Sequence, residues 1–388
     1  MAMLLAGDER GLRSDRPASG PQEGLPWRPL SPLSIEAPHV LSDVAASSPE
    51  DVWVVGQAHG RPLAARWDGT SWSVPPGPPP SAALIGAGLE GVAAARTGHA
   101  VPDGSGPAGH TDLRNEPAGR DALAEVIAVG GAYDRLLGTE IPLIRHWDGT
   151  GWAEMAAPAL PDADSAQGYV LTDVTMVAPA EAWAVGHGSG RGNGLVALHW
   201  HHDRWHPAGL PDIAQGKLLA VCGTSPWDVW AVGAADRAGL VVHYDGRAWQ
   251  RIRTPATRFP LTDVTAVSPD DAWCAGGGSV LRWNGRKWSR VKTPIESANT
   301  VTAVSATDVW VGGAQGELAH FDGHRWTWMT APGDLHGTAV WRSSTVALPT
   351  SAPGAGIGAA VWMVGSRRLG GSVSTPQHRS FTSQSGEG

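Results

Sequence analysis

Residues 66–72 read Arg-Trp-Asp-Gly-Thr-Ser-Trp, and residues 146–152 repeat the phrase as His-Trp-Asp-Gly-Thr-Gly-Trp. Weaker copies, each an aromatic residue, a turn and a second Trp, follow at 199–205, 243–249, 282–288 and 320–326. Asp-Gly between two such runs is a signal for a tight hairpin turn. The copies recur at roughly 40–50 residues, a period typical of repeat proteins built from hairpins.

Other landmarks accompany each copy in a fixed order. A short apolar run such as 41–46 comes first, then a turn with an acidic residue such as 48–51, then an apolar run that ends in glycine such as 52–56. With the two strands that flank the Asp-Gly turn, each unit predicts four strands. Seven glycines of this kind predict seven units: Gly56, Gly130, Gly186, Gly233, Gly276, Gly313 and Gly365.

The seventh unit has no Asp-Gly turn and outer Trp after Gly365, whereas residues 25–33 look like an outer strand without a unit. We therefore predict an all-β, seven-bladed β-propeller with four-stranded antiparallel blades, closed by the N-terminal strand 25–33 joining the C-terminal blade. One propeller domain would span 25–370. Residues 1–24 and most of 371–388 are expected to be flexible tails, and loop insertions are expected at 97–122 and 343–358.

A charge pattern supports this alignment. The residue before the first aromatic of each hairpin is basic, and an acidic residue begins the strand that should lie beside it. Antiparallel pairing brings the two positions face to face, where opposite charges are favourable. The expected pairs are Arg66–Asp51, His146–Glu125, His199–Glu181, His243–Asp228, Arg282–Asp271 and His320–Asp308.

The pattern of Trp, acid and His resembles that of the WD40, kelch and Asp-box propellers over about residues 25–380. The Gly-His and Trp-Asp dipeptides of WD40 repeats are out of register here, and Asp-Gly-x-x-Trp is one residue shorter than an Asp box. The resemblance therefore implies the propeller superfold and no narrower family. The chain has 20 Trp against 3 Phe and 3 Tyr, and the repeated Trp are expected to pack blade against blade.

Composition excludes several classes of partner. The net charge is −8 and no Lys/Arg run accompanies exposed aromatics, so we expect no nucleic-acid partner. The apolar run at 3–6 is too short for a signal-peptide core, and no stretch is long enough to span a membrane. Cys222 and Cys274 are predicted to be small buried residues. We expect a cytoplasmic monomer without membrane attachment.

Two groups of side chains could hold a metal ion. Asp43, Asp173 and Asp263 begin the first strands of alternate units and converge on the central axis, where carboxylates would suit Mg²⁺ or Ca²⁺. The alternative is that each Asp caps its own turn by accepting hydrogen bonds from nearby backbone amides. A second group, His199, His201, His202 and His206, is expected to be an outer turn that has lost its Asp-Gly, although zinc remains an alternative.

Non-repeated residues near the channel are better functional candidates, because the scaffold explains the repeated ones. Our first hypothesis is a non-catalytic propeller that binds a protein segment or small ligand at the channel face. The channel-face candidates include His39, His59, Tyr133, Asp134, Arg135, Asp236, Arg237, Arg258, Glu296 and Glu317.

The alternative is a lyase, hydrolase or cyclase that acts on a small natural-product-like substrate at the channel mouth. This would resemble the bacterial streptogramin lyases and the strictosidine-synthase-like proteins, which use His and acidic residues, often with a divalent ion. That resemblance would assign catalysis to His187, His336, Asp173 and Asp263. A lectin-like propeller with one sugar pocket per blade is a third reading, based on the paired Trp.

Overall fold

The computed structural model shows an all-β chain. It describes residues 2–8, 28–29, 33, 35, 38–48, 50–96, 124–160, 168–189, 194–213, 215–313, 317–330, 338–348 and 358–367. The expected insertion at 97–122 and the expected tail at 371–388 lie outside these residues.

Six blades each consist of four consecutive antiparallel strands. Blade 1 contains β3 (His39–Ser48), β4 (Asp51–Ala58), β5 (Arg61–Trp67) and β6 (Trp72–Ser73). Blade 2 contains β7 (Leu84–Arg96), β8 (Ala124–Asp134), β9 (Thr139–Trp147) and β10 (Trp152–Glu154). Blade 3 contains β11 (Tyr169–Ala178), β12 (Glu181–Gly188), β13 (Leu195–His201) and β14 (Arg204–Pro207).

Blades 4 to 6 repeat this order. Blade 4 contains β15 (Lys217–Ser225), β16 (Asp228–Ala235), β17 (Ala238–Tyr244) and β18 (Trp249–Arg251). Blade 5 contains β19 (Asp263–Ser268), β20 (Asp271–Gly276), β21 (Ser279–Trp283) and β22 (Trp288–Val291). Blade 6 contains β23 (Ala298–Ser305), β24 (Asp308–Gly313), β25 (Glu317–Phe321) and β26 (Trp326–Thr330).

The remaining strands form a composite sheet from the two ends of the described chain, in the order β2 (Arg28–Pro29), β1 (Ala2–Asp8), β28 (Gly358–Arg367), β27 (Thr338–Leu348). The structure therefore has six complete blades of the repeat rather than the seven predicted. The seventh unit lacks its own hairpin after Gly365, and β1 pairs there instead, with Met3 opposite Gly365.

Two predicted boundaries are wrong. Residues 1–24 were expected to be a tail, but β1 lies within them, because its apolar run can pair with the open edge of β28. Residues 343–358 were expected to be a loop insertion, but 343–348 continue β27, where Thr345 lies opposite Val361. The β-branched residues of this segment favour a strand. The predicted outer strand at 25–33 contains β2, which is the edge strand of the composite sheet.

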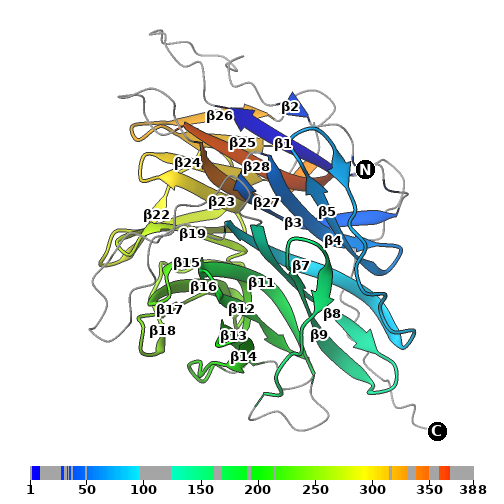
Figure 1. The fold of residues 1–388 in the computed structure, drawn as a ribbon. Coiled ribbons are helices and arrows are strands. Elements are labelled where there is room, and N and C mark those ends of the chain that lie inside the picture. The colour runs from blue at the N-terminus through cyan, green and yellow to red at the C-terminus, as the bar shows by residue number, and fades with distance from the viewer. Residues whose placement is uncertain are drawn as a thin grey trace, which may run out of the picture.

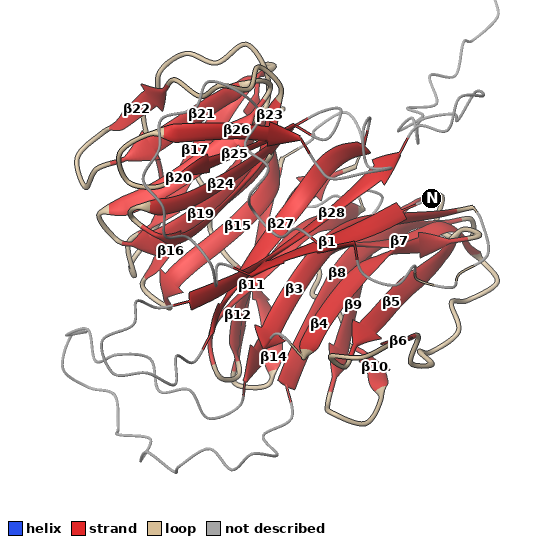
Figure 2. Ribbon diagram, turned by 90° about the horizontal axis from the view of Figure 1, so that it is seen from above, coloured by secondary structure: helices blue, strands red, loops and turns tan. Residues whose placement is uncertain are grey.

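The first strands of the blades surround the centre of the molecule. In Figure 1, β3, β7, β11, β15, β19 and β23 lie around the centre, whereas outer strands such as β14, β18 and β22 lie toward the periphery. Each first strand contacts the first strand of the next blade, and β27 contacts both β23 and β3. The view from above in Figure 2 shows the sheets as successive, twisted layers.

Tryptophans connect the blades. The Trp of a second strand packs against the hairpin aromatics of the next blade, as in Trp230, whose ring centroid lies 5.2 Å from that of Trp283 and 5.4 Å from that of Trp288. Blade 2 has Ile127 at this position, fully buried in one cluster with Trp205 of blade 3. The expected packing role of the repeated Trp is thus confirmed where these contacts are described.

The repeated glycine of the second strand is required by a close approach. In blades 1 to 4 and 6 the first strand has a register shift near this point, as between Leu171 and Asp173 of β11. A Cβ built on Gly186 would lie 1.9 Å from the carbonyl oxygen of Val170, closer than any side chain tolerates. Built Cβ atoms on Gly56, Gly130 and Gly233 would lie 1.9–2.0 Å from the equivalent carbonyls.

No helix in the described residues is long and apolar enough to cross a membrane. Both cysteines are free, and Cys274 is fully buried, as expected.

Candidate functional site

Asp43, Asp173 and Asp263 line one central cavity of about 240 Å³. Each is only 6% exposed. The backbone N–H of Val92 donates to Oδ2 of Asp43 (2.8 Å), and that of Val221 donates to Oδ2 of Asp173 (2.8 Å). In both cases the carboxylate belongs to one blade and the amide to the next.

Asp263 repeats this arrangement between blades 5 and 6. The backbone N–H of Val301 donates to its Oδ2 at 2.9 Å, and the Thr300 hydroxyl donates to the same oxygen. Among the described residues no group of three or more His, Cys, Asp or Glu side chains is placed to hold a metal ion. Each of the three carboxylates thus accepts a hydrogen bond from a backbone amide of the next blade and joins two neighbouring blades.

Three of the four residues predicted to be catalytic lie in the described part of the chain, and two of them, Asp173 and Asp263, line the same central cavity. His187 lies in β12, and its Nδ1 is 3.1 Å from the carbonyl oxygen of Gly188. Asp173 and Asp263 also accept hydrogen bonds from the amides of Val174 and Val264 (2.9 Å each). His336, the fourth member of the set, lies outside the described residues.

All six predicted charge pairs are confirmed, with N···O distances of 2.6–3.1 Å. The basic side chain also stacks on the Trp of the second strand, as when His243 lies 3.9 Å from Trp230, centroid to centroid. In blade 2 a hydrogen bond from His146 lowers the pKa of Glu125. Because the arrangement repeats around the ring, we assign it to the scaffold.

Four histidines gather on blade 3. His201 stacks on His206 (4.3 Å between centroids, 19° between planes), and its Nδ1 lies 2.9 Å from Nδ1 of His202. Partial burial, with the neighbouring imidazoles of His199, His206 and His202, lowers the pKa of His201. Among the described residues, no three of these side chains are placed to hold a metal ion.

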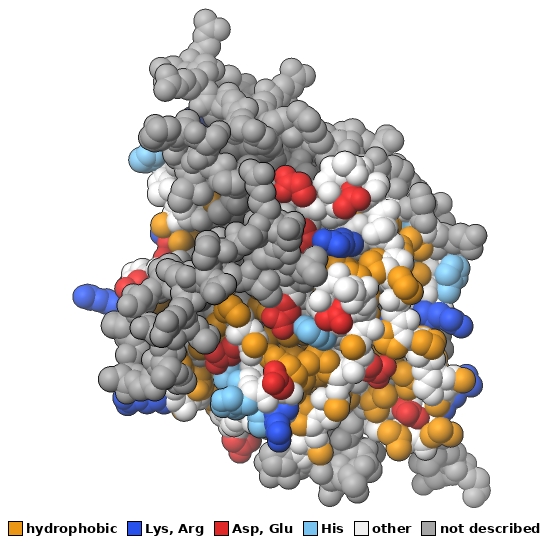
Figure 3. All heavy atoms as spheres, in the orientation of Figure 1, with side chains coloured by type: hydrophobic (Ala, Val, Ile, Leu, Met, Phe, Trp, Pro, Cys, Tyr) orange, Lys and Arg blue, Asp and Glu red, His pale blue; other side chains and the backbone are white. Residues whose placement is uncertain are grey.

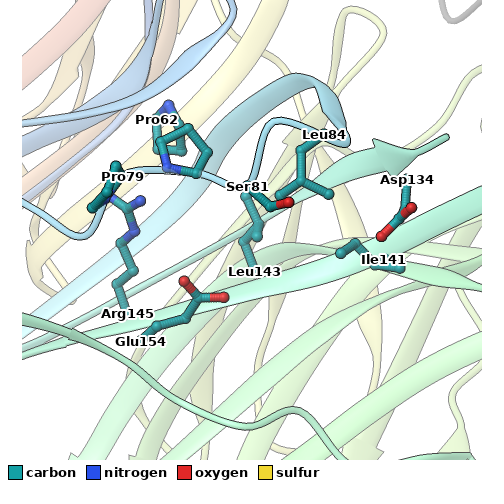
Figure 4. Close-up of a pocket in the computed structure, with 10 residues that line it drawn as sticks. Pro62, Pro79, Ser81, Leu84, Asp134, Ile141, Leu143, Arg145 and Glu154 are labelled. Atoms are coloured by element: carbon teal, nitrogen blue, oxygen red, sulfur yellow. The ribbon is translucent and has the colours of Figure 1, made fainter. Parts of the chain in front are cut away.

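A second cavity, of about 330 Å³, lies where blade 1 meets blade 2 (Figure 4). Six of its ten lining residues are Pro, Leu or Ile, and three are charged. In Figure 4, Asp134 lies at one end, Arg145 lies at the other, and Glu154 lies near Arg145. Its lining residues are Pro62, Pro79, Pro80, Ser81, Leu84, Asp134, Ile141, Leu143, Arg145 and Glu154.

Arg145 is held rigidly in this wall. It is only 6% exposed, and its Nη2 donates to the carbonyl oxygen of Pro78 at 2.7 Å. Burial lowers the pKa of the guanidinium, and the nearby Glu154 carboxylate partly offsets that effect. The buried donor thus ties β9 to the connection that leads into blade 2.

Four large apolar side chains are exposed at this end of blade 2, and we call them the hairpin patch: Ile85, Tyr133, Leu136 and Leu137. Leu84 and Asp134 line the cavity, so the next pair along the two strands, Ile85 and Tyr133, lies on the other face of the blade. Leu136 is 85% exposed and Leu137 is 67% exposed, while Ile85 and Tyr133 are each 44% exposed. Ile85 lies directly opposite Tyr133 in the β7–β8 pairing. More broadly, Figure 3 shows hydrophobic side chains spread among isolated charged ones on the face of Figure 1.

The β8–β9 turn, which carries Leu136 and Leu137, differs from the equivalent turns of other blades. In blades 1, 4 and 5 the second and third strands are joined by two residues with positive φ, such as His59 and Gly60. The β8–β9 turn has four residues between its strands. Oδ1 of Asp134 organises it by accepting hydrogen bonds from the amides of Leu136 (2.7 Å) and Leu137 (3.2 Å).

The channel-face candidates predicted from sequence include Tyr133, Asp134 and Arg135 but not Ile85, Leu136 or Leu137. Those candidates are almost all charged residues or His, so the exposed aliphatic side chains are not among them. The available signal was the adjacent pair of leucines in a turn, since turns between strands are normally polar.

Comparison by sequence finds no matching protein-family model and no matching curated protein. Solved structures do match in fold. U3-55K has a TM-score of 0.52 at 10% identity, covering 85% of this chain and 97% of that one. The WD40 repeats of RRP9 give 0.52 at 10% identity, covering 85% and 96%. YCF48 bound to D1 peptide gives 0.49 at 14% identity, covering 84% and 91%. At such identities the likeness concerns the fold alone: the chain is a β-propeller with four-stranded antiparallel blades.

Proposed function

We propose that the protein is a non-catalytic β-propeller that binds a protein segment through the hairpin patch and the adjoining cavity. The observation that carries this proposal is the exposure of Leu136 (85%) and Leu137 (67%) in one turn. Leaving large aliphatic side chains in water forgoes roughly 1.5–3 kcal/mol for each. Large apolar side chains exposed together at one end of a blade are typical of a surface that a partner covers.

The scaffold behind the patch is suited to this role. The amide of Val92 in blade 2 donates to Asp43 of blade 1, and Ile127 of blade 2 packs in one cluster with Trp205 of blade 3. A rigid surface loses little conformational entropy on binding. In this proposal the composite sheet acts as a seventh blade that closes the ring, which is supported by the contacts of β27 with both β23 and β3.

The lyase, hydrolase or cyclase alternative has less support. It needs Asp173 and Asp263 as general acids, bases or metal ligands, and both accept backbone hydrogen bonds across a blade junction. A catalytic carboxylate must instead be directed at a substrate.

The test removes the patch without disturbing the blade. The test variant is Leu136→Ser/Leu137→Ser, which changes two exposed side chains of the turn. The matched control is Trp328→Ser, because Trp328 on β26 is also apolar and 40% exposed. Each protein is cross-linked in its own cells and quantified by mass spectrometry. We expect a partner whose cross-links map to residues 133–139, are lost in the double variant and persist in the control. Partners that bind both variants equally would refute the proposal.

A further inference from the structure

The charges of the blade 1–blade 2 cavity indicate what kind of segment it accepts. Asp134 uses Oδ1 to hold its own turn, and within the described residues no hydrogen bond is recorded to Oδ2. Glu154 is exposed, lies directly opposite Arg145 in the β9–β10 pairing, and interacts with it electrostatically without forming an ion pair within the described residues. Two carboxylates with spare acceptor capacity therefore face the cavity.

Apolar side chains make up most of the remaining lining residues. Leu84, Ile141, Leu143 and Pro62 line the space near these carboxylates. Such a wall suits an aliphatic stem, and a carboxylate at its end suits a cation. Lys and Arg side chains combine both features, since they bury their methylene stems along apolar surface while the charged head remains near water or acid.

We propose that the bound segment carries a Lys or Arg side chain that enters this cavity, flanked by apolar residues that cover the hairpin patch. This inference rests on the proposed function and adds the chemistry of the partner. Arg145 is fixed at one end of the cavity by the Pro78 carbonyl, and its positive charge directs the entering cation toward Asp134. An acidic segment would be repelled by the carboxylates of Asp134 and Glu154 and attracted by the guanidinium of Arg145 alone.

Selection from a random peptide library tests the inference without a known partner. A phage-displayed library of 12-residue peptides is selected on the full chain and counter-selected on Leu136→Ser/Leu137→Ser. The enriched peptides are synthesised, and their affinity is measured by fluorescence polarisation at low salt. We expect them to carry Lys or Arg next to Leu, Ile, Val or aromatic residues.

Charge variants then examine the cavity directly. Asp134→Asn keeps the Oδ1 acceptor that the turn needs, and Glu154→Gln keeps the size of the side chain. We expect the double variant to bind the basic peptides about tenfold more weakly, or ~1.4 kcal/mol. The control, Asp236→Asn/Glu296→Gln, removes the same charge from exposed residues of blade 4 and of the segment before blade 6, and should bind as the unmodified chain does.

The outcomes separate the two proposals. Patch-dependent peptides that lack basic residues, or basic peptides whose affinity survives Asp134→Asn/Glu154→Gln, would overturn the inference and leave the proposed function standing. A selection that yields no peptide dependent on Leu136 and Leu137 would overturn the proposed function, and with it the inference.

Discussion

Replacing Asp173 by Asn should destabilise the ring, because one side-chain oxygen becomes a donor. Oδ2 of Asp173 accepts from the amide of Val221 (2.8 Å) and Oδ1 accepts from that of Val174 (2.9 Å). Whichever way the Asn amide turns, its NH₂ group then faces a backbone N–H. The substitution changes neither shape nor volume, so the effect can be assigned to hydrogen bonding.

The size of the loss follows from the burial of the site. A hydrogen bond to a charged group contributes roughly 1.5–3 kcal/mol, and a buried donor without a partner costs about 1–3 kcal/mol. Both figures describe in part the same lost interaction, so they do not add in full, and we expect the free energy of unfolding to fall by about 3 kcal/mol. For 388 residues at an unfolding entropy of about 2 cal/mol/K per residue, this is a fall of about 4 °C in the midpoint.

Urea and thermal unfolding, followed by tryptophan fluorescence, measure this change. The control is Asp68→Asn, since the exposed Asp68 uses Oδ1 to accept from the amides of Thr70 and Ser71, and Asn retains that oxygen. A loss below about 1 kcal/mol for Asp173→Asn would refute the inter-blade role. So would stabilisation of the unmodified chain by millimolar Ca²⁺ or Mg²⁺ that Asp173→Asn abolishes, because that result would restore the metal site.

Three further predictions concern the scaffold. Gly186→Ala should cost about 3 kcal/mol in urea unfolding, because the new Cβ meets the Val170 carbonyl, whereas Gly209→Ala, with open space, should cost far less. Trp230→Leu, which empties a fully buried blade junction, should also cost about 3 kcal/mol. His201 should titrate below pH 6.5 by NMR; its contribution to stability, present above that pH, should be lost as the pH falls toward its lowered folded-state pKa.

The repeat allowed most of the scaffold to be predicted from sequence. Period, turn chemistry and charge all indicated the same four strands, and the pairing of Arg282 with Asp271 could be derived from register alone. Because the spacing of the turns and the charge pattern are independent, the alignment would be wrong only if both were misleading. The count of complete blades failed because a glycine marks only a second strand, and the hairpin that should follow Gly365 is replaced by β1 from the other end of the sequence.

The central aspartates show a limit of a different kind. Sequence placed Asp43, Asp173 and Asp263 on one axis, which is where the structure has them. The sequence could not show that the next blade presents a backbone amide to each Asp. Every residue except Pro carries a backbone amide, and only the fold decides where it points. A weak signal was the alternation itself: blades 2 and 4 carry Gly91 and Ala220 at the equivalent positions. A Cβ on Gly91 would lie 2.5 Å from Cα of Asp173.

The same reasoning explains why function is best sought where the repeat is broken. A repeated residue is held in place by the ring, because each blade needs it to pack against the next. The β8–β9 turn escapes this constraint, since its four residues project beyond the two-residue turns of blades 1, 4 and 5. Nothing in the packing of blade 2 requires leucine at 136 or 137, which remain 85% and 67% exposed. A side chain that the fold does not use, and that water disfavours, is best explained by a partner that covers it.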